Sequence, residues 1–234
     1  MTPETEALVE HATQLARAGG WSGAGVEHLF LAMLDDDLGR SILTQAGARI
    51  DDLRTQIGWI LRGAPKRDLD AAQWLSAIEA LDLQARRGDL TVGLLLSHLM
   101  ATRTAVTKIL AEQGVSRVDV LNVVVHGTSR TTSIPSARVV RGAGEHRADK
   151  HVRYRVVFHN DQFTSIEFVC DVLDRHVGMR QATARSFATE VDHMGVASLG
   201  PYKLKHALKL IELVTREAHA AGFPLKLSCE PIPG

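Results

Sequence analysis

The stretch that decides the fold of the second half of this chain runs from His159 to Leu173 and reads HNDQFTSIEFVCDVL. Apolar side chains recur at steps of three and four residues over positions 165–175, a period that predicts an amphipathic helix. Residues 154–158 are mostly β-branched or aromatic and predict a strand. Asn160 and Asp161 are typical of the loop between such elements. We therefore expect a strand, a polar loop and a helix in direct succession.

A mixed α and β pattern continues to the end of the chain. Helical periodicity predicts a second helix over about residues 180–193 and a third over about residues 202–220. Residues 224–230 alternate apolar and polar side chains, which predicts a final strand. We therefore expect residues 151–234 to form a small α/β (α+β) domain.

Residues 1–127 show helical periodicity throughout, and parts of the pattern occur twice. The run at residues 26–34 has a counterpart at 92–100, and the run at 42–47 has one at 109–114. We expect a duplicated, all-helical domain whose two copies bury their apolar faces against each other. Two unrelated amphipathic hairpins are the alternative. The predicted helices of the first copy lie at residues 4–18, 26–34 and 51–61.

Residues 128–150 separate the two regions and lack any periodicity. They are rich in small and charged side chains, which is typical of a flexible linker. The predicted division of the chain is therefore 1–127, 128–150 and 151–234.

Composition argues against several classes of function. Hydrophobic residues make up 45% and charged residues 23%, as in ordinary globular proteins. A formal net charge of zero argues against nucleic acid as a partner. The acidic N-terminal stretch and the absence of a long apolar run predict neither a signal peptide nor a membrane anchor. The two cysteines cannot form a disulfide framework, so we expect a cytoplasmic location.

The sequence contains no phosphate-binding loop, no Gly-x-Ser-x-Gly elbow and no His-Glu-x-x-His motif. We therefore expect a protein that is not an enzyme, with no catalytic residue, no cofactor and no metal site. His146 and His151 are expected to be solvated rather than to bind a metal. Cys170 falls on the expected buried face of its helix, and we interpret it as a core residue rather than a nucleophile.

The polar loop carries groups that suit a positively charged ligand. An α-ammonium group that enters a partly desolvated pocket needs a carboxylate and amide or carbonyl acceptors. Asn160 and Asp161 can supply them. Ile166 and Val169 would present a small apolar wall to a bulky side chain.

Thr164 is expected to cap the following helix, with Glu167 three positions later completing a capping box.

The stretch from His159 to Leu173 resembles the signature of ClpS, the bacterial adaptor that recognises N-terminal degrons and delivers them to a Clp ATPase. The similarity extends through Gly195 to the closing Pro224-Leu225-Lys226-Leu227 segment and covers nearly all of residues 151–231. It implies a three-stranded antiparallel sheet with three helices. The peptide-binding residues that it implies are Asn160, Asp161, Thr164, Ile166, Val169, Ala188, Val191, Asp192 and Leu225.

Several positions depart from the ClpS pattern. Asp192 stands where ClpS proteins usually carry a histidine that contacts the α-amino group. A slip of one residue in the helix would place His193 there instead. Ala188 replaces a residue that is often methionine, which would make the pocket wider or shallower. Gln162 and Ile166 also differ from the usual residues and leave the side-chain preference open.

The duplicated region resembles the N-domain of Clp/Hsp100 unfoldases over about residues 1–127. The resemblance rests on Val26-Glu27-His28-Leu29, on its second copy, and on the segment from Gly114 to Gly127. In some relatives a glutamate at the position of Glu27 contributes to binding phosphorylated arginine. Gly93 replaces it in the second copy, so at most one such contact would survive. Capping of its helix is an equally good role for Glu27.

Together these resemblances predict a non-catalytic adaptor of Clp protease. Its second domain would bind N-degrons with a bulky hydrophobic first residue, and its first domain would help to engage a ClpA- or ClpC-like AAA+ unfoldase. The linker would also allow the two domains to dock on each other. The docking residues of ClpS align with Lys205 and Leu210, so the usual contact is altered. The alternative is a regulatory or decoy protein that competes for Clp adaptors or substrates without binding degrons.

Overall fold

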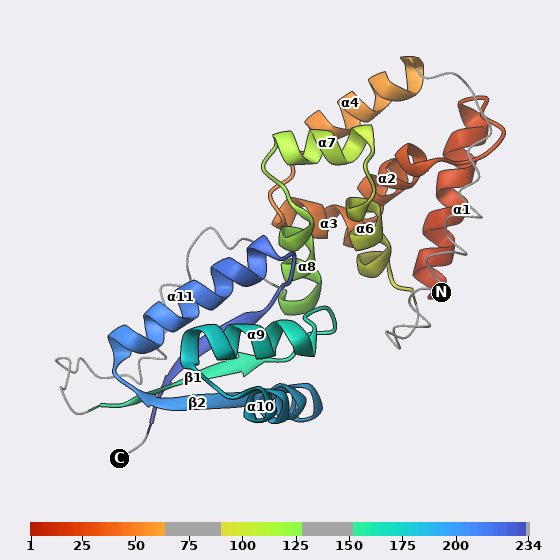
Figure 1. The fold of residues 1–234 in the computed structure, drawn as a ribbon. Coiled ribbons are helices and arrows are strands. Elements are labelled where there is room, and N and C mark those ends of the chain that lie inside the picture. Colours follow the sequence, from red (N-terminus) through yellow and green to blue (C-terminus); the bar gives the residue numbers. More distant parts are fainter. Residues whose placement is uncertain (64–89, 128–151, 233–234) are drawn as a thin grey trace. The chain divides into compact units, whose positions relative to one another are not determined.

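The computed structural model describes residues 1–63, 90–127 and 152–232. The chain divides into two compact units, Met1–Arg130 and Thr131–Gly234. The predicted linker at residues 128–150 lies outside the described residues, as do His146 and His151. The described part of the first unit is helical, and the second unit combines helices with a sheet (Figure 1).

The N-terminal unit contains one order of helices twice. After α1 (Pro3–Ala18), the first copy comprises α2 (Val26–Asp35), α3 (Asp37–Gln45) and α4 (Ile50–Gly63). The second copy comprises α6 (Val92–Ala101), α7 (Ala105–Glu112) and α8 (Arg117–His126). The copies pack across each other, because α3 contacts α6 and α8 while α4 contacts α7. The predicted helices at 4–18, 26–34 and 51–61 correspond to α1, α2 and α4.

The repeated segments at residues 42–47 and 109–114 end α3 and α7 in the same way, each with an Ile-Leu pair and a glycine four residues after the leucine. Leu43 and Leu110 are fully buried in their helices. Gly47 and Gly114 follow with φ angles of 100° and 78°, a left-handed conformation that glycine adopts without a steric penalty. The duplication predicted for this unit is therefore confirmed in the described residues.

Gly93 marks one position where the two copies differ in chemistry. Its counterpart Glu27 lies half-buried in the first turn of α2, whereas Gly93 is buried in α6. A Cβ atom added at Gly93 would lie 2.9 Å from Cγ1 of Val124 in α8. Packing against α8 therefore excludes an acidic side chain from the second copy.

The C-terminal unit is a three-stranded antiparallel sheet with three helices, as predicted, and the helices pack on one face of the sheet. The strands are β1 (Tyr154–His159), β2 (Val196–Tyr202) and β3 (Lys226–Pro231), and the order in the sheet is β2-β1-β3. The helices are α9 (Ile166–Val177), α10 (Gln181–Met194) and α11 (Leu204–Ala220). The residue pattern alone did not locate β2. It lies where only the Gly195 turn and the start of a helix were expected.

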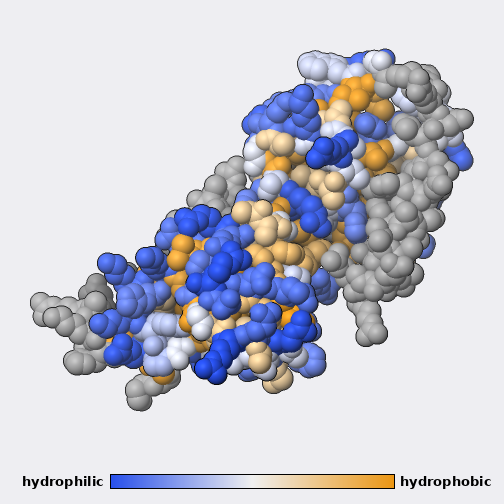
Figure 2. All heavy atoms as spheres, viewed as in Figure 1, coloured by the Kyte–Doolittle hydropathy of each residue, from blue (hydrophilic) through white to orange (hydrophobic). Residues whose placement is uncertain are grey.

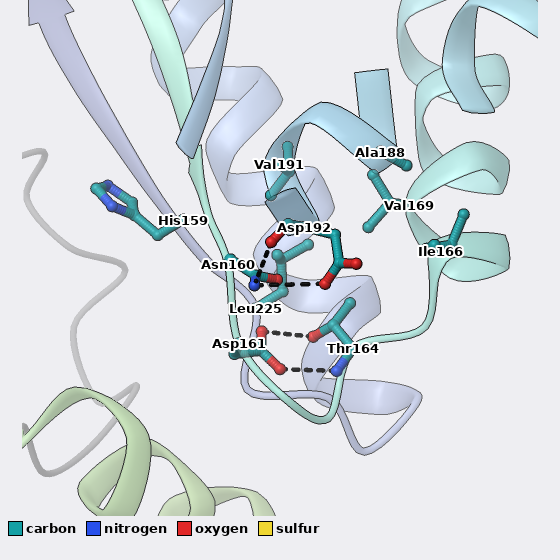
Figure 3. Close-up of a pocket in the computed structure, with 10 residues that line it drawn as sticks. All are labelled: His159, Asn160, Asp161, Thr164, Ile166, Val169, Ala188, Val191, Asp192 and Leu225. Carbon is teal, nitrogen blue, oxygen red and sulfur yellow. Dashed lines mark hydrogen bonds between the residues drawn. The ribbon is translucent and has the colours of Figure 1, made fainter. Parts of the chain in front are cut away.

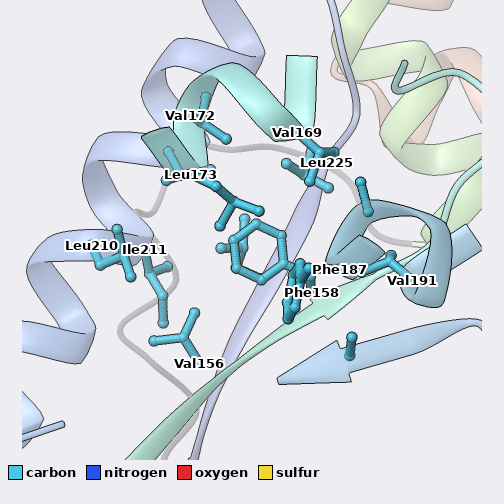
Figure 4. Close-up of a cluster of buried hydrophobic side chains, with 14 of the residues drawn as sticks. Val156, Phe158, Val169, Val172, Leu173, Phe187, Val191, Leu210, Ile211 and Leu225 are labelled. Atoms are coloured by element: carbon cyan, nitrogen blue, oxygen red, sulfur yellow. The ribbon is translucent and has the colours of Figure 1, made fainter. Parts of the chain in front are cut away.

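One hydrophobic core holds the helices against the sheet (Figure 4). Phe158 of the central strand pairs with Ala197 and Leu227 on its two neighbours, so that core side chains lie side by side on one face. Phe158 also meets Phe187 of α10 edge to face, with the ring centroids 5.3 Å apart. Because β1 is central, the loop that follows it starts directly beside this core.

Leu210 of α11 belongs to the same core and is only 7% exposed. Leu210 therefore packs inside the unit and is not available for a contact at the surface, whereas Lys205 is exposed. That these two positions correspond to the docking residues of ClpS stays a prediction.

We expect Gly93→Ala to destabilise the N-terminal unit by about 1–2 kcal/mol, because the new methyl group would overpack against Val124. The matched control is Gly58→Ala in α4, where the added Cβ would meet only the tip of Arg62 at 3.5 Å. This control should stabilise the unit by up to about 1 kcal/mol through helix propensity. All three tryptophans lie within residues 1–127, so tryptophan fluorescence during urea unfolding reports on this unit. Equal effects of the two substitutions would contradict the packing argument.

Candidate functional site

Asp161 organises the loop between β1 and α9. Its Oδ1 accepts hydrogen bonds from the backbone N–H groups of Phe163, at 2.8 Å, and Thr164, at 2.7 Å. Its Oδ2 accepts from the hydroxyl group of Thr164 at 2.7 Å. The Asp161 side chain is 7% exposed, and these three donors offset the cost of burying its charge.

The predicted capping role of Thr164 is wrong. Ser165 is the N-cap of α9, and its Oγ accepts from the backbone N–H of Phe168 at 3.2 Å. Thr164 precedes the N-cap by one residue, and its hydroxyl group donates a hydrogen bond to Asp161 instead of capping the helix. Glu167 completes no capping box in the structure. Its Oε1 instead lies 3.6 Å from Nη2 of Arg185 in α10.

Asn160 joins this loop to the end of α10. Its backbone N–H donates to the carbonyl oxygen of Gly195 at 2.8 Å. Its side-chain Nδ2 donates to the carbonyl oxygen of Asp192 at 3.2 Å and lies 3.5 Å from Oδ1 of the same residue (Figure 3). The amide oxygen of Asn160 has no partner among the described residues and remains an available acceptor.

A small pocket that is partly open to solvent lies between this loop, α9 and α10 (Figure 3). Its apolar floor and walls come from three elements, and the polar groups of the loop lie at its mouth. All of the predicted peptide-binding residues are brought together here: Asn160, Asp161, Thr164, Ile166, Val169, Ala188, Val191, Asp192 and Leu225. Such a combination of an apolar cavity with a few convergent polar groups is typical of a ligand site.

The α10 register brings Asp192 to the pocket, and His193 does not line it. His159 lines the pocket as well and was not predicted. The imidazole ring of His159 points away from the other lining residues in Figure 3 and lies 2.8 Å from Oγ of Ser228. The sequence signal for this residue was its place at the start of the ClpS-like stretch, directly before Asn160.

Two other predicted features have a clear place in the structure. Glu27 lies in the first turn of α2, but the cap of that helix comes from His28, whose Nδ1 accepts from the backbone N–H of Gly25 at 3.1 Å. A substrate contact through Glu27 stays a prediction. Cys170 is 4% exposed in the core, and burial raises the pKa of its thiol, which suits a packing residue rather than a nucleophile.

Hydrophilic residues cover most of the visible face of the C-terminal unit (Figure 2). Within the described ranges, no helix is both long enough and apolar enough to cross a membrane. The same ranges contain no group of three or more His, Cys, Asp or Glu side chains that could hold a metal ion.

Two family models match the chain in separate regions. The model described as ATP-dependent Clp protease adaptor protein ClpS matches residues 149–228. The model described as Clp repeat (R) N-terminal domain matches residues 1–113.

Individual relatives agree with the match to ClpS. The ATP-dependent Clp protease adapter protein ClpS of Desulfatibacillum aliphaticivorans is 40% identical over 78 residues, which is 33% of this chain and 75% of the relative. The ClpS of Clostridium acetobutylicum is 32% identical over 84 residues, or 36% of this chain and 83% of the relative. A solved structure of Agrobacterium tumefaciens ClpS2 bound to L-phenylalaninamide is 30% identical and covers 35% of this chain and 98% of its own. Its TM-score of 0.34 is too low to carry a structural argument.

We expect Ser165→Ala to lower the stability of the C-terminal unit by about 1 kcal/mol, because α9 loses its N-cap. Glu167→Gln is the matched control and should change stability by less than about 0.5 kcal/mol, because its side chain is 71% exposed. Both tyrosines, Tyr154 and Tyr202, lie in this unit, so near-ultraviolet circular dichroism of tyrosine can follow its thermal unfolding. Equal losses from the two substitutions would contradict the assignment of Ser165 as the N-cap.

Proposed function

Because this chain belongs to the ClpS family of ATP-dependent Clp protease adaptors, we propose that its pocket binds N-degrons for delivery to a Clp unfoldase. The substrates would be proteins whose first residue is bulky and hydrophobic. The single observation that carries the proposal is the position of free acceptors at the mouth of a pocket with an aliphatic floor.

The mouth of the pocket suits an α-ammonium group. Such a group has three N–H donors. The amide oxygen of Asn160 and the carboxylate of Asp192 are acceptors that the loop and α10 leave available, since the carboxylate receives only one long hydrogen bond, at 3.5 Å, from the described residues. An N-acetylated peptide would lose both the charge and two of the donors, so the site should reject it.

The floor of the pocket suits an apolar first side chain. Val169, Ala188, Val191 and Leu225 are each no more than 5% exposed and present only aliphatic surface. Burying a leucine or phenylalanine side chain there would contribute about 1.5–3 kcal/mol. A charged first side chain would find no partner at this depth and is expected to be excluded.

The N-terminal unit would supply the connection to the proteolytic machine. Its match to the Clp repeat N-terminal domain supports a role in engaging a ClpA- or ClpC-like AAA+ unfoldase. No phosphate-binding loop occurs within these 234 residues, so the ATP-driven step would belong to that partner. Residues 128–150 would form the linker between the units 1–127 and 151–234. This linker would also allow the two units to dock on each other.

The proposal also places the protein in the cytoplasm. Cys170 and Cys229 are both buried and free, as is usual in a reducing compartment.

The first test is a titration of a fluorescent Phe-initiated peptide with the full-length protein, followed by anisotropy. We expect the free-amine peptide to bind at least about tenfold more tightly than its N-acetylated form, because the charged hydrogen bonds contribute about 1.5–3 kcal/mol. A peptide that starts with aspartate serves as the side-chain control and should bind weakly. Equal affinity for all three peptides, or no binding at all, would refute degron recognition while leaving the family assignment in place.

The second test measures delivery. The full-length protein is added to a Clp unfoldase with its peptidase, ATP and a Phe-initiated fluorescent protein, and the rate of substrate loss is followed. We expect an increased rate for this substrate and no change for the same protein with a glycine at its N-terminus. A reduced rate would favour the alternative of a regulatory protein that withholds substrates, and an unchanged rate would contradict delivery.

A further inference from the structure

The two carboxylates at the pocket differ in how many of their acceptor positions are already in use. A carboxylate has about four lone-pair positions. Asp161 receives three donors from its own loop, all between 2.7 and 2.8 Å. Little of its capacity remains for a ligand, and its 7% exposure confirms that the loop encloses it.

Asp192 has the opposite environment. It lies in the last turn of α10 and is exposed to solvent. The only donor to its carboxylate in the described part of the chain is Nδ2 of Asn160, at 3.5 Å, which is longer than an ordinary hydrogen bond. Figure 3 shows this carboxylate on the pocket side of α10, facing the loop that carries Asn160.

We infer that Asp192 is the main ion-pair partner of the α-ammonium group of a bound peptide, and that Asp161 is a positioning residue that shapes the loop. The inference rests on the proposed function and assigns the recognition of charge to α10 rather than to the loop. The sequence alone had pointed to Asn160 and Asp161 of the loop as the acceptors for the α-ammonium group.

The assignment has a consequence for how binding responds to salt. An ion pair at an exposed carboxylate is screened by dissolved ions, whereas a carboxylate enclosed by its own loop is screened much less. If Asp192 carries the charge recognition, the affinity for a free-amine peptide should fall as salt rises, and this fall should depend on Asp192.

The experiment compares Asp192→Asn, Asp192→Glu and Asp161→Asn in the full-length protein. The readouts are the affinities for the Phe-initiated peptide and its N-acetylated form, the salt dependence of each, and the thermal unfolding of the C-terminal unit. Asp174→Asn on the exposed side of α9 is the matched control, since it makes the same charge change away from the pocket.

For Asp192→Asn we expect an affinity loss of about tenfold or more for the free-amine peptide. We also expect no change for the acetylated peptide, a weaker salt dependence and an unchanged unfolding temperature. Asp192→Glu should retain most of the preference for the free amine. Asp161→Asn should lower the unfolding temperature and weaken both peptides in similar proportion, because it loosens the loop rather than the ion pair. Asp174→Asn should behave like the unaltered protein.

Two results would overturn the assignment while leaving degron binding intact. One is a full amine preference in Asp192→Asn. The other is an Asp161→Asn variant that unfolds at the unaltered temperature yet no longer distinguishes the two peptides. If the unaltered protein itself fails to prefer the free amine, the proposed function falls and the assignment falls with it.

Discussion

Asn160 makes the bonds on which the geometry of the C-terminal unit depends. Its backbone N–H donates to the carbonyl of Gly195 at 2.8 Å, and its side chain donates to the carbonyl of Asp192 at 3.2 Å. These bonds join the end of the central strand to the turn between α10 and β2. Because α10 also carries Ala188 and Val191, any displacement at this junction would move the mouth and the floor of the pocket together. The position of the site is therefore tied to the sheet that supports it.

The N-terminal unit has a similar anchor between α1 and the start of its second copy. The carbonyl oxygen of Leu90 accepts from the backbone N–H of Thr2 at 3.1 Å and from the hydroxyl of Thr5 at 2.9 Å, which fixes the start of α1 beside the entry to α6. The two copies nevertheless do not share the same surface chemistry. Gly93 is packed against Val124, while Glu27 keeps its carboxylate at the start of α2. Duplication preserved the helices and left only one copy able to carry an acidic group there.

Much of the fold could be predicted from periodicity, because most helices here bury one face along their length. The pocket could not, since residues 166, 188 and 225 meet only through tertiary packing, and their grouping came from the resemblance to ClpS. Thr164 and Ser165 are both good N-caps, and only the hydrogen bonds of Asp161 separate their roles. Gly200 and Pro201 are typical of turns, so the sequence pattern does not predict β2, and only its pairing with β1 identifies this strand.

The sheet order leaves β2 and β3 as edge strands, and each contains a proline near its end, Pro201 and Pro231. A proline removes one backbone N–H from an edge that could otherwise pair with a foreign strand. The C-terminal unit therefore offers a foreign chain an interrupted edge on which to extend the sheet, and this lowers its tendency to aggregate through strand pairing.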